Sequence, residues 1–184
     1  MAFARRIGDP ESLYFVTFAT VQWVDVFTRS TYVDIVLDSL RYCQKEKGLR
    51  IHAWCIMSNH VHLLITTKLG HHPSDFLRDF KKFTSKKIIT SIEDKTLPES
   101  RRNWMLWLFR TAGQDNSKNQ IYQFWQQENH PVEIFSNKFM DQKLAYIHDN
   151  PVKAGLVDDP WEYRYSSARD YMKNQRGLLD IEFL

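Results

Sequence analysis

The chain has 184 residues, of which 43% are hydrophobic and 26% are charged, a composition typical of a folded protein, and we expect one domain over residues 1–184. No apolar run approaches the roughly 20 residues of a membrane helix, and we expect no signal peptide. The two cysteines are too few for a disulfide framework and indicate free thiols in the cytoplasm. The net charge of +3 permits a nucleic-acid partner without requiring one.

The first part of the chain predicts a strand, a helix and a β-hairpin. The predicted elements are a strand at 13–20, a helix from Ser30 or Thr31 to about Lys47, and strands at 49–57 and 60–67. The strands are rich in aromatic and β-branched side chains. Gly48 is expected to end the helix, and Ser58 and Asn59 to form the tight turn of the hairpin.

The second part predicts two more helices and a fourth strand. The predicted elements are a helix at 73–92, a loop at 113–120, a strand at 121–125, and a helix from Ser136 or Asn137 to Asn150. Pro151 is expected to end the last helix, because proline disfavours helical geometry in the residue before it. The order strand, helix, hairpin, helix, strand, helix predicts an α+β fold with an antiparallel sheet and helices packed on it.

Two histidines stand two residues apart in the second hairpin strand. Side chains at i and i+2 of a strand point to the same face, so His60 and His62 should lie side by side. Two neutral imidazoles can bind one divalent ion. The spacing alone is weak evidence, and with its strand context and the preceding turn it is equally consistent with a metal site and with an incidental pair of histidines. An amidohydrolase barrel also uses this spacing, but needs roughly 250 residues and a βαβα repeat.

The last predicted helix separates polar from apolar side chains. Its polar face carries Gln142, Tyr146 and Asn150, and its apolar face, expected to pack on the sheet, carries Met140, Leu144 and Ile147. His148 points away from Tyr146 around the helix. Taken alone, a tyrosine at such a position is most simply a half-buried surface residue.

Four sequence blocks resemble a known family. The block MSNHVHLLI at 57–65 resembles the His-hydrophobic-His motif of the HUH endonucleases. The blocks LAYIHDNPVKAGLV at 144–157 and YRYSSARDY at 163–171 are similar to the single-tyrosine transposases, and most closely to the REP-associated tyrosine transposases, as is FWQ at 124–126. The blocks occur in the family's order between residues 14 and 171. The resemblance implies a ferredoxin-like antiparallel sheet and a metal-dependent transposase.

The resemblance also implies a role for each matching residue. His60 and His62 match the metal ligands, Tyr146 matches the nucleophile, and Asn150 matches the polar residue that completes the metal shell. Mg²⁺ or Mn²⁺ suits a shell of imidazole, amide and water, and would neutralise a phosphodiester under attack. The implied product is a 5′-phosphotyrosine with a free 3′-OH. The implied partner is single-stranded or hairpin DNA, bound by a cytoplasmic, nucleoid-associated monomer or homodimer.

The sequence also offers candidate DNA-binding residues. They are Arg78, Lys81, Lys82, Lys86, Trp125 and Gln126. Arg78, Lys82 and Lys86 form a basic row at i, i+4 and i+8 of the helix at 73–92, balanced by a single Asp79. An opposite apolar row is expected from Phe76, Phe80 and Phe83. A solvated helix face is the alternative.

Aromatic side chains give two further candidates. Trp125 and Gln126 can stack on and hydrogen-bond a base, although a buried strand tryptophan is equally consistent. A second patch combines Arg101 and Arg102 with Trp104 and Trp107, whose rings can equally belong to the core.

Two other functions remain open from the sequence. One is a domesticated nucleic-acid-binding protein that keeps the fold without transposition activity, and the other is a metal-dependent hydrolase of small phosphoesters. The combination of His60, His62 and Tyr146 favours catalysis over simple binding. The long basic helix favours DNA over a small phosphoester.

Overall fold

A computed structural model describes residues 7, 9–114, 121–127 and 131–184. Its strands and α-helices are β1 (Tyr14–Ala19), α1 (Ser30–Glu46), β2 (Leu49–Ile56), β3 (His60–Thr67), α2 (Pro73–Glu93), α3 (Arg102–Gln114), β4 (Val132–Glu133), α4 (Asn137–Lys153) and α5 (Ala168–Lys173). Short 3-10 helices occupy Val21–Trp23, Val26–Thr28 and Pro160–Glu162. The strands form one antiparallel sheet in the order β2-β3-β1-β4. The predicted α+β fold is confirmed.

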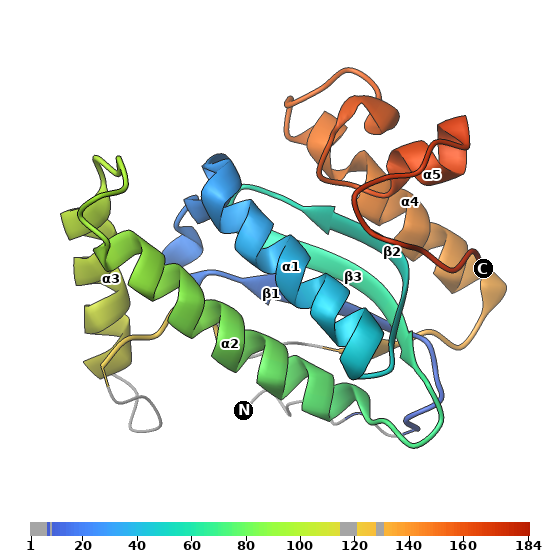
Figure 1. The fold of residues 1–184 in the computed structure, drawn as a ribbon. Coiled ribbons are helices and arrows are strands. Elements are labelled where there is room, and N and C mark those ends of the chain that lie inside the picture. Colours follow the sequence, from blue (N-terminus) through green and yellow to red (C-terminus); the bar gives the residue numbers. More distant parts are fainter. Residues whose placement is uncertain (1–6, 8, 115–120, 128–130) are drawn as a thin grey trace.

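One face of the sheet is covered by α1 and α2, which lie side by side across it (Figure 1). Val16 and Phe18 of β1, together with Val61 and Leu63 of β3, point into the large core beneath these helices. These side chains alternate with those of the other face, as the two-residue period of a strand requires.

The opposite face of the sheet carries the polar motif and is covered by α4. The β1–β3 pairs on this face are Phe15–Leu64, Thr17–His62 and Ala19–His60. The stripe of α4 that packs on a smaller core here consists of Met140, Leu144 and Ile147, which confirms the predicted docking face. The sheet therefore separates α1 and α2 from α4 (Figure 1).

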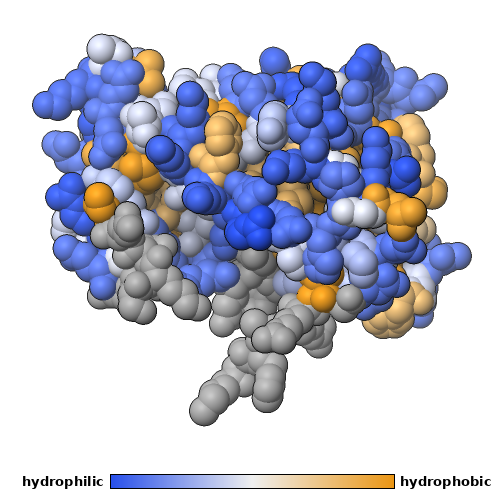
Figure 2. Space-filling view, turned by 60° about the horizontal axis from the view of Figure 1, so that its bottom comes forward, coloured by the Kyte–Doolittle hydropathy of each residue, from blue (hydrophilic) through white to orange (hydrophobic). Residues whose placement is uncertain are grey.

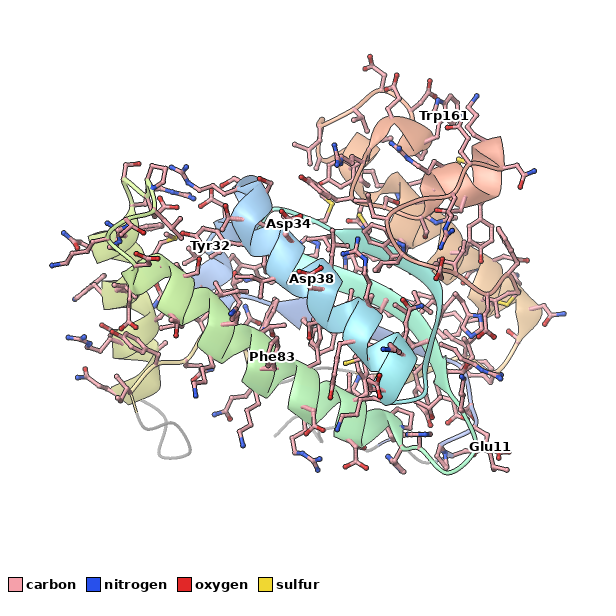
Figure 3. All side chains as sticks on the ribbon, viewed as in Figure 1. Glu11, Tyr32, Asp34, Asp38, Phe83 and Trp161 are labelled. Carbon is pink, nitrogen blue, oxygen red and sulfur yellow. The ribbon has the colours of Figure 1, made fainter. Side chains whose placement is uncertain are left out.

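The buried row of α2 differs from the prediction at one aromatic residue. Buried positions advance four at a time through Phe76, Phe80, Thr84 and Ile88, whereas Phe83, labelled in Figure 3, is 56% exposed. Because the row follows the i+4 spacing, position 83 falls one residue outside it. The expectation that Phe83 belongs to the apolar row is wrong.

Residues 121–125 do not form the predicted fourth strand. Only Trp125 makes a β-bridge, to Thr20, and Phe124 accepts a hydrogen bond from the backbone N–H of Val21. These backbone contacts are made to Thr20 and Val21, which follow β1, and not to the residues of β1 itself. The fourth strand is the two-residue β4.

Other differences from the predicted elements lie at α4 and α3. Pro151 does not end α4, which continues to Lys153 with Pro151 buried in its last turns, so tertiary packing overrides the local preference. Helix α3 was not predicted. Of the predicted loop at 113–120, Gly113 and Gln114 form the end of α3 instead, and the rest lies outside the described residues.

The figures and the helices give a first view of the surface of the described residues. Among the described helices, none combines the length and apolar character needed to span a membrane. The face shown in Figure 2 is largely hydrophilic, with apolar side chains in scattered patches outside the atoms drawn in grey. Scattered exposed apolar residues are ordinary for a folded protein.

Candidate active site

The two histidines of β3 lie together on the face covered by α4. The ring centroids of His60 and His62 are 4.6 Å apart, with the ring planes at 71°. The two rings therefore lie side by side on one face of the sheet, as the i, i+2 spacing predicts.

Each histidine is oriented by a hydrogen bond at Nδ1. The Asn59 side chain donates through Nδ2 to the carbonyl oxygen of Trp23 at 3.1 Å, and its Oδ1 lies 2.6 Å from Nδ1 of His60. An amide oxygen only accepts, so His60 donates from Nδ1 and keeps the lone pair on Nε2. Nδ1 of His62 lies 2.8 Å from the Thr17 hydroxyl. Partners of this kind hold metal-binding histidines in other proteins.

The free nitrogens fit a divalent ion. Nε2 of His62 is buried and has no hydrogen-bond partner among the described residues, which is costly for a polar atom unless a ligand satisfies it. Burial lowers the pKa of His60 to about 4. Burial, followed by the charges of His60 and Lys143, lowers the pKa of His62 to about 3. Both rings are therefore neutral at physiological pH, the form that binds metals.

Tyr146 reaches this pair from α4. Ser136 caps the helix by accepting a hydrogen bond from the Phe139 backbone N–H at 3.3 Å. The apolar stripe then fixes the rotation of the helix. The Tyr146 ring is 40% exposed and its centroid lies 5.2 Å from that of His62. His148 is buried and bonds Ser167 through Nε2 at 2.9 Å, away from the pair as expected.

Lys143 is part of the same group and was not singled out from the sequence. Its Nζ lies 4.5 Å from the centroid of the Phe15 ring and 5.5 Å from that of Tyr146. Residues three apart on a helix are neighbours, so the spacing to Tyr146 is the signal that could have identified it. The ammonium group places a positive charge beside the tyrosine, where an anion would gain from it.

Asn150 lies one helical turn beyond Tyr146. Its Nδ2 donates to the Tyr146 carbonyl oxygen at 2.7 Å, which leaves Oδ1 as the atom able to bind a metal. Tyr146 contacts both Phe15 and His62, and Asn150 follows it by four residues on the same face of α4. The described residues include no cluster of three or more His, Cys, Asp or Glu side chains.

The basic row of α2 lies on the other side of the sheet. Lys82 and Lys86 are exposed. Arg78 is paired with Asp75 at 2.8 Å and with Asp79 at 3.0 Å. The expectation of a single balancing Asp79 is therefore wrong, because Asp75 also pairs with the row. Among the described residues, Lys82 and Lys86 have no carboxylate partner, whereas Arg78 has two.

Lys81 belongs to the interior side of α2. Its Nζ donates to the carbonyl oxygen of Gln126 at 2.6 Å, and burial lowers its pKa to about 8. Gln126 in turn donates through Nε2 to the Thr20 carbonyl oxygen at 3.1 Å. These contacts hold the FWQ segment between α2 and the end of β1.

Trp125 is a core residue. It is 4% exposed, its Nε1 donates to the Thr84 hydroxyl at 2.9 Å, and its ring stacks on Phe27 with centroids 5.7 Å apart. Stacking on a base would require the core to open. The buried alternative therefore holds, and Trp125 is corrected from a candidate DNA contact to a structural residue.

In the second aromatic patch the two tryptophan rings are exposed, but the two arginines are already engaged in contacts within the protein. Trp104 and Trp107 are 48% and 61% exposed. Arg101 is paired with Asp25 at 2.6 Å, and Arg102 donates to three backbone carbonyls, including that of Ile92 at 2.6 Å. Arg101 is therefore used to hold the segment after β1, and Arg102 to hold the chain at the end of α2.

Comparisons with known proteins identify a family for the larger part of the chain. The family described as "Transposase IS200 like" matches residues 12–123, a range that contains His60 and His62 and ends before Tyr146. No curated protein matches the chain.

One solved structure shares the fold. A REP-associated tyrosine transposase bound to a REP hairpin has 17% identity and a TM-score of 0.68, over 100% of this chain and 95% of that one. A Deinococcus radiodurans protein described as a transposase has 19% identity and a TM-score of 0.47, over 81% of this chain and 97% of that one. The family model covers more than half of the residues of this chain, and the chain therefore belongs to the IS200-like transposase family.

Proposed function

We propose that this protein cuts and rejoins single-stranded DNA through Tyr146, with a divalent ion, Mg²⁺ or Mn²⁺, held by His60, His62 and Asn150. The observation that carries the proposal is the position of the Tyr146 ring, 5.2 Å from the ring of His62, whose buried Nε2 has no partner among the described residues. A nucleophile and an unsatisfied metal-binding nitrogen thus share one site.

The proposed reaction exchanges one phosphoester for another. The Tyr146 oxygen forms a bond to phosphorus while the bond from phosphorus to the 3′ oxygen breaks. The phenolic proton is lost to solvent and the departing 3′ oxygen gains one, giving a 5′-phosphotyrosine and a free 3′-OH. Because the number of phosphoester bonds is unchanged, rejoining needs no nucleoside triphosphate.

The residues around Tyr146 have complementary roles in this reaction. A divalent ion, when bound, would neutralise the phosphate and favour the anionic form of the attacking oxygen. Burial keeps His60 and His62 neutral and able to ligate. Lys143 contributes a fixed positive charge beside the tyrosine, and Phe15 packs edge-on against the Tyr146 ring with centroids 5.9 Å apart.

Hairpin DNA is the proposed substrate, and Lys82 and Lys86 are the proposed backbone contacts. The structural neighbour with a TM-score of 0.68 is bound to a REP hairpin, which supports the choice of substrate. Since α2 covers the face opposite Tyr146, these lysines would bind DNA away from the cleaved bond. Their contribution would be affinity rather than chemistry.

The test is covalent trapping with labelled hairpin oligonucleotides in Mg²⁺ or Mn²⁺. A 5′-phosphotyrosine retains the DNA downstream of the cut, so a 3′ label should remain with the protein on a denaturing gel and a 5′ label should not. Tyr146→Phe should abolish the adduct and preserve DNA binding, because it removes only the hydroxyl.

Two other tyrosines serve as matched controls. The hydroxyl of Tyr163 donates to the Ile56 carbonyl and that of Tyr171 donates to the His52 carbonyl, at 2.9 and 2.8 Å. Tyr163→Phe and Tyr171→Phe should therefore still form the adduct. Loss of the adduct in one of these variants but not in Tyr146→Phe would contradict the assignment. Absence of any adduct from the unmodified protein would favour a DNA-binding role without catalysis.

A further inference from the structure

An exposed tryptophan stands beside the candidate metal site. Trp23 ends the 3-10 helix that follows β1 and is 55% exposed. Its ring packs edge-on against His60, with centroids 5.7 Å apart. By contrast, Trp54 and Trp125 are buried in the core. A large flat apolar surface is therefore directed to solvent next to a residue proposed to bind the ion.

The backbone at this point has an uncommon conformation. Gln22 and Trp23 have φ angles of 52° and 55°, in the left-handed region that residues with a Cβ atom disfavour. Two such residues in succession persist only when their surroundings hold them, and positions of this kind concentrate at functional sites. The conformation turns the Trp23 side chain toward His60.

Side-chain hydrogen bonds from Thr20 and Asn59 hold the conformation. The hydroxyl of Thr20, a fully buried residue, shares its one hydrogen between the carbonyl oxygens of Val24 and Asn59, at 2.8 and 3.0 Å. Asn59 donates to the carbonyl oxygen of Trp23 while its Oδ1 accepts from His60. One side chain thus fixes both the Trp23 backbone and the His60 ring. The exposed ring has a defined position relative to the site.

We propose that the Trp23 ring is the stacking surface for an unpaired base adjacent to the cleaved phosphate. This inference rests on the proposed function, because it takes the phosphate to be bound at His60 and His62. A ring in contact with His60 is within reach of a nucleotide whose phosphate lies there. Aromatic side chains stack on every base, since each base has a π face. Trp23 would therefore hold single-stranded DNA in place rather than read its sequence, and bases stacked within a duplex would not have access to it.

The test measures binding of a fluorescein-labelled single-stranded oligonucleotide of mixed sequence and of its duplex, across salt concentrations. All proteins carry Tyr146→Phe so that no cleavage occurs. Trp23→Ala should weaken single-strand binding by about 5- to 150-fold, the range for loss of one stacked base. Trp23→Phe should keep most of the affinity. The salt slope and duplex binding should not change, because no phosphate contact is lost.

Tyr42→Ala is the matched control, since Tyr42 is an aromatic residue of α1 with 57% exposure, on the face opposite Tyr146, and should bind as before. Placing 5-iododeoxyuridine in the oligonucleotide gives a second readout in the unmutated protein, where irradiation should cross-link the peptide containing Trp23. If Trp23→Ala fails to fold, the cross-linking result alone tests whether Trp23 contacts the DNA.

Unchanged single-strand affinity in folded Trp23→Ala, or cross-linking only to other peptides, would overturn the inference. If the Tyr146 adduct forms in the same preparations of unmodified protein, the proposed function stands without the stacking surface. If the unmodified protein neither binds single-stranded DNA nor forms the adduct, both proposals fail.

Discussion

Replacing Asn59 by alanine should weaken metal binding without removing a ligand. Asn59 accepts the Nδ1 proton of His60 at 2.6 Å, which keeps the lone pair on Nε2 and fixes the ring. Loss of such a partner typically lowers metal affinity by about 10- to 100-fold, equivalent to about 1.4–2.7 kcal/mol. The dissociation constant for Mn²⁺, measured by calorimetry or by the electron paramagnetic resonance of free Mn²⁺, should rise by that factor.

A double-mutant cycle identifies the route of the effect. Asn59 is expected to act through His60, so Asn59→Ala should cost little further affinity in a His60→Ala background. Thr17→Val is the parallel change at His62, whose Nδ1 lies 2.8 Å from the Thr17 hydroxyl. The reasoning would be refuted if Asn59→Ala reduced Mn²⁺ affinity equally in the unmodified protein and in His60→Ala. An unchanged Mn²⁺ affinity in Asn59→Ala alone would also refute it.

Three further predictions use other parts of the structure. Lys143→Met should slow single-turnover adduct formation about 10-fold by removing the charge beside Tyr146, while Lys143→Arg retains most activity; equal rates in both variants would contradict this role. Replacing Lys82 and Lys86 by alanine should weaken binding to all hairpins alike and flatten the salt dependence of the dissociation constant, and an unchanged slope would identify a simple solvated surface. Burial lowers the pKa of His148 to about 4, so the unfolded chain binds more protons between about pH 6.5 and pH 4. The free energy of unfolding should therefore fall as the pH drops through that range, by up to about 3 kcal/mol from this residue. Denaturant titrations should show a smaller pH dependence in His148→Gln, and identical pH profiles would exclude the contribution.

Much of the fold could be predicted because its main elements have clear periods. The strand alternation that places His60 and His62 on one face is visible in the sequence, as is the stripe of Met140, Leu144 and Ile147 on α4. Helix α3 was missed because Trp104 and Trp107 are exposed and obscure its apolar face. The two residues of β4 are too few to show any period.

The candidate site was predictable in its members but not in its geometry. The 5.2 Å approach of Tyr146 to His62 depends on how α4 packs on the sheet, which no local pattern specifies. Trp125 could be assigned to the core only from its contacts with Phe27 and Thr84. Trp23 lies in a three-residue turn with no period, so its exposure beside the site could not be inferred from its neighbours in sequence.

The two cores of the protein differ greatly in extent. Helices α1 and α2 share the large core. The core between α4 and the sheet is a small group of buried side chains: Phe15, Ala53, Cys55, Met57, Leu64 and Ile147. Local opening requires less free energy where less apolar surface is buried. We therefore expect the layer that carries Tyr146 to detach and re-dock many times before the molecule unfolds. Amide exchange would be faster in α4 than in β3, and small losses of packing there would reduce catalysis well before they reduced the melting temperature.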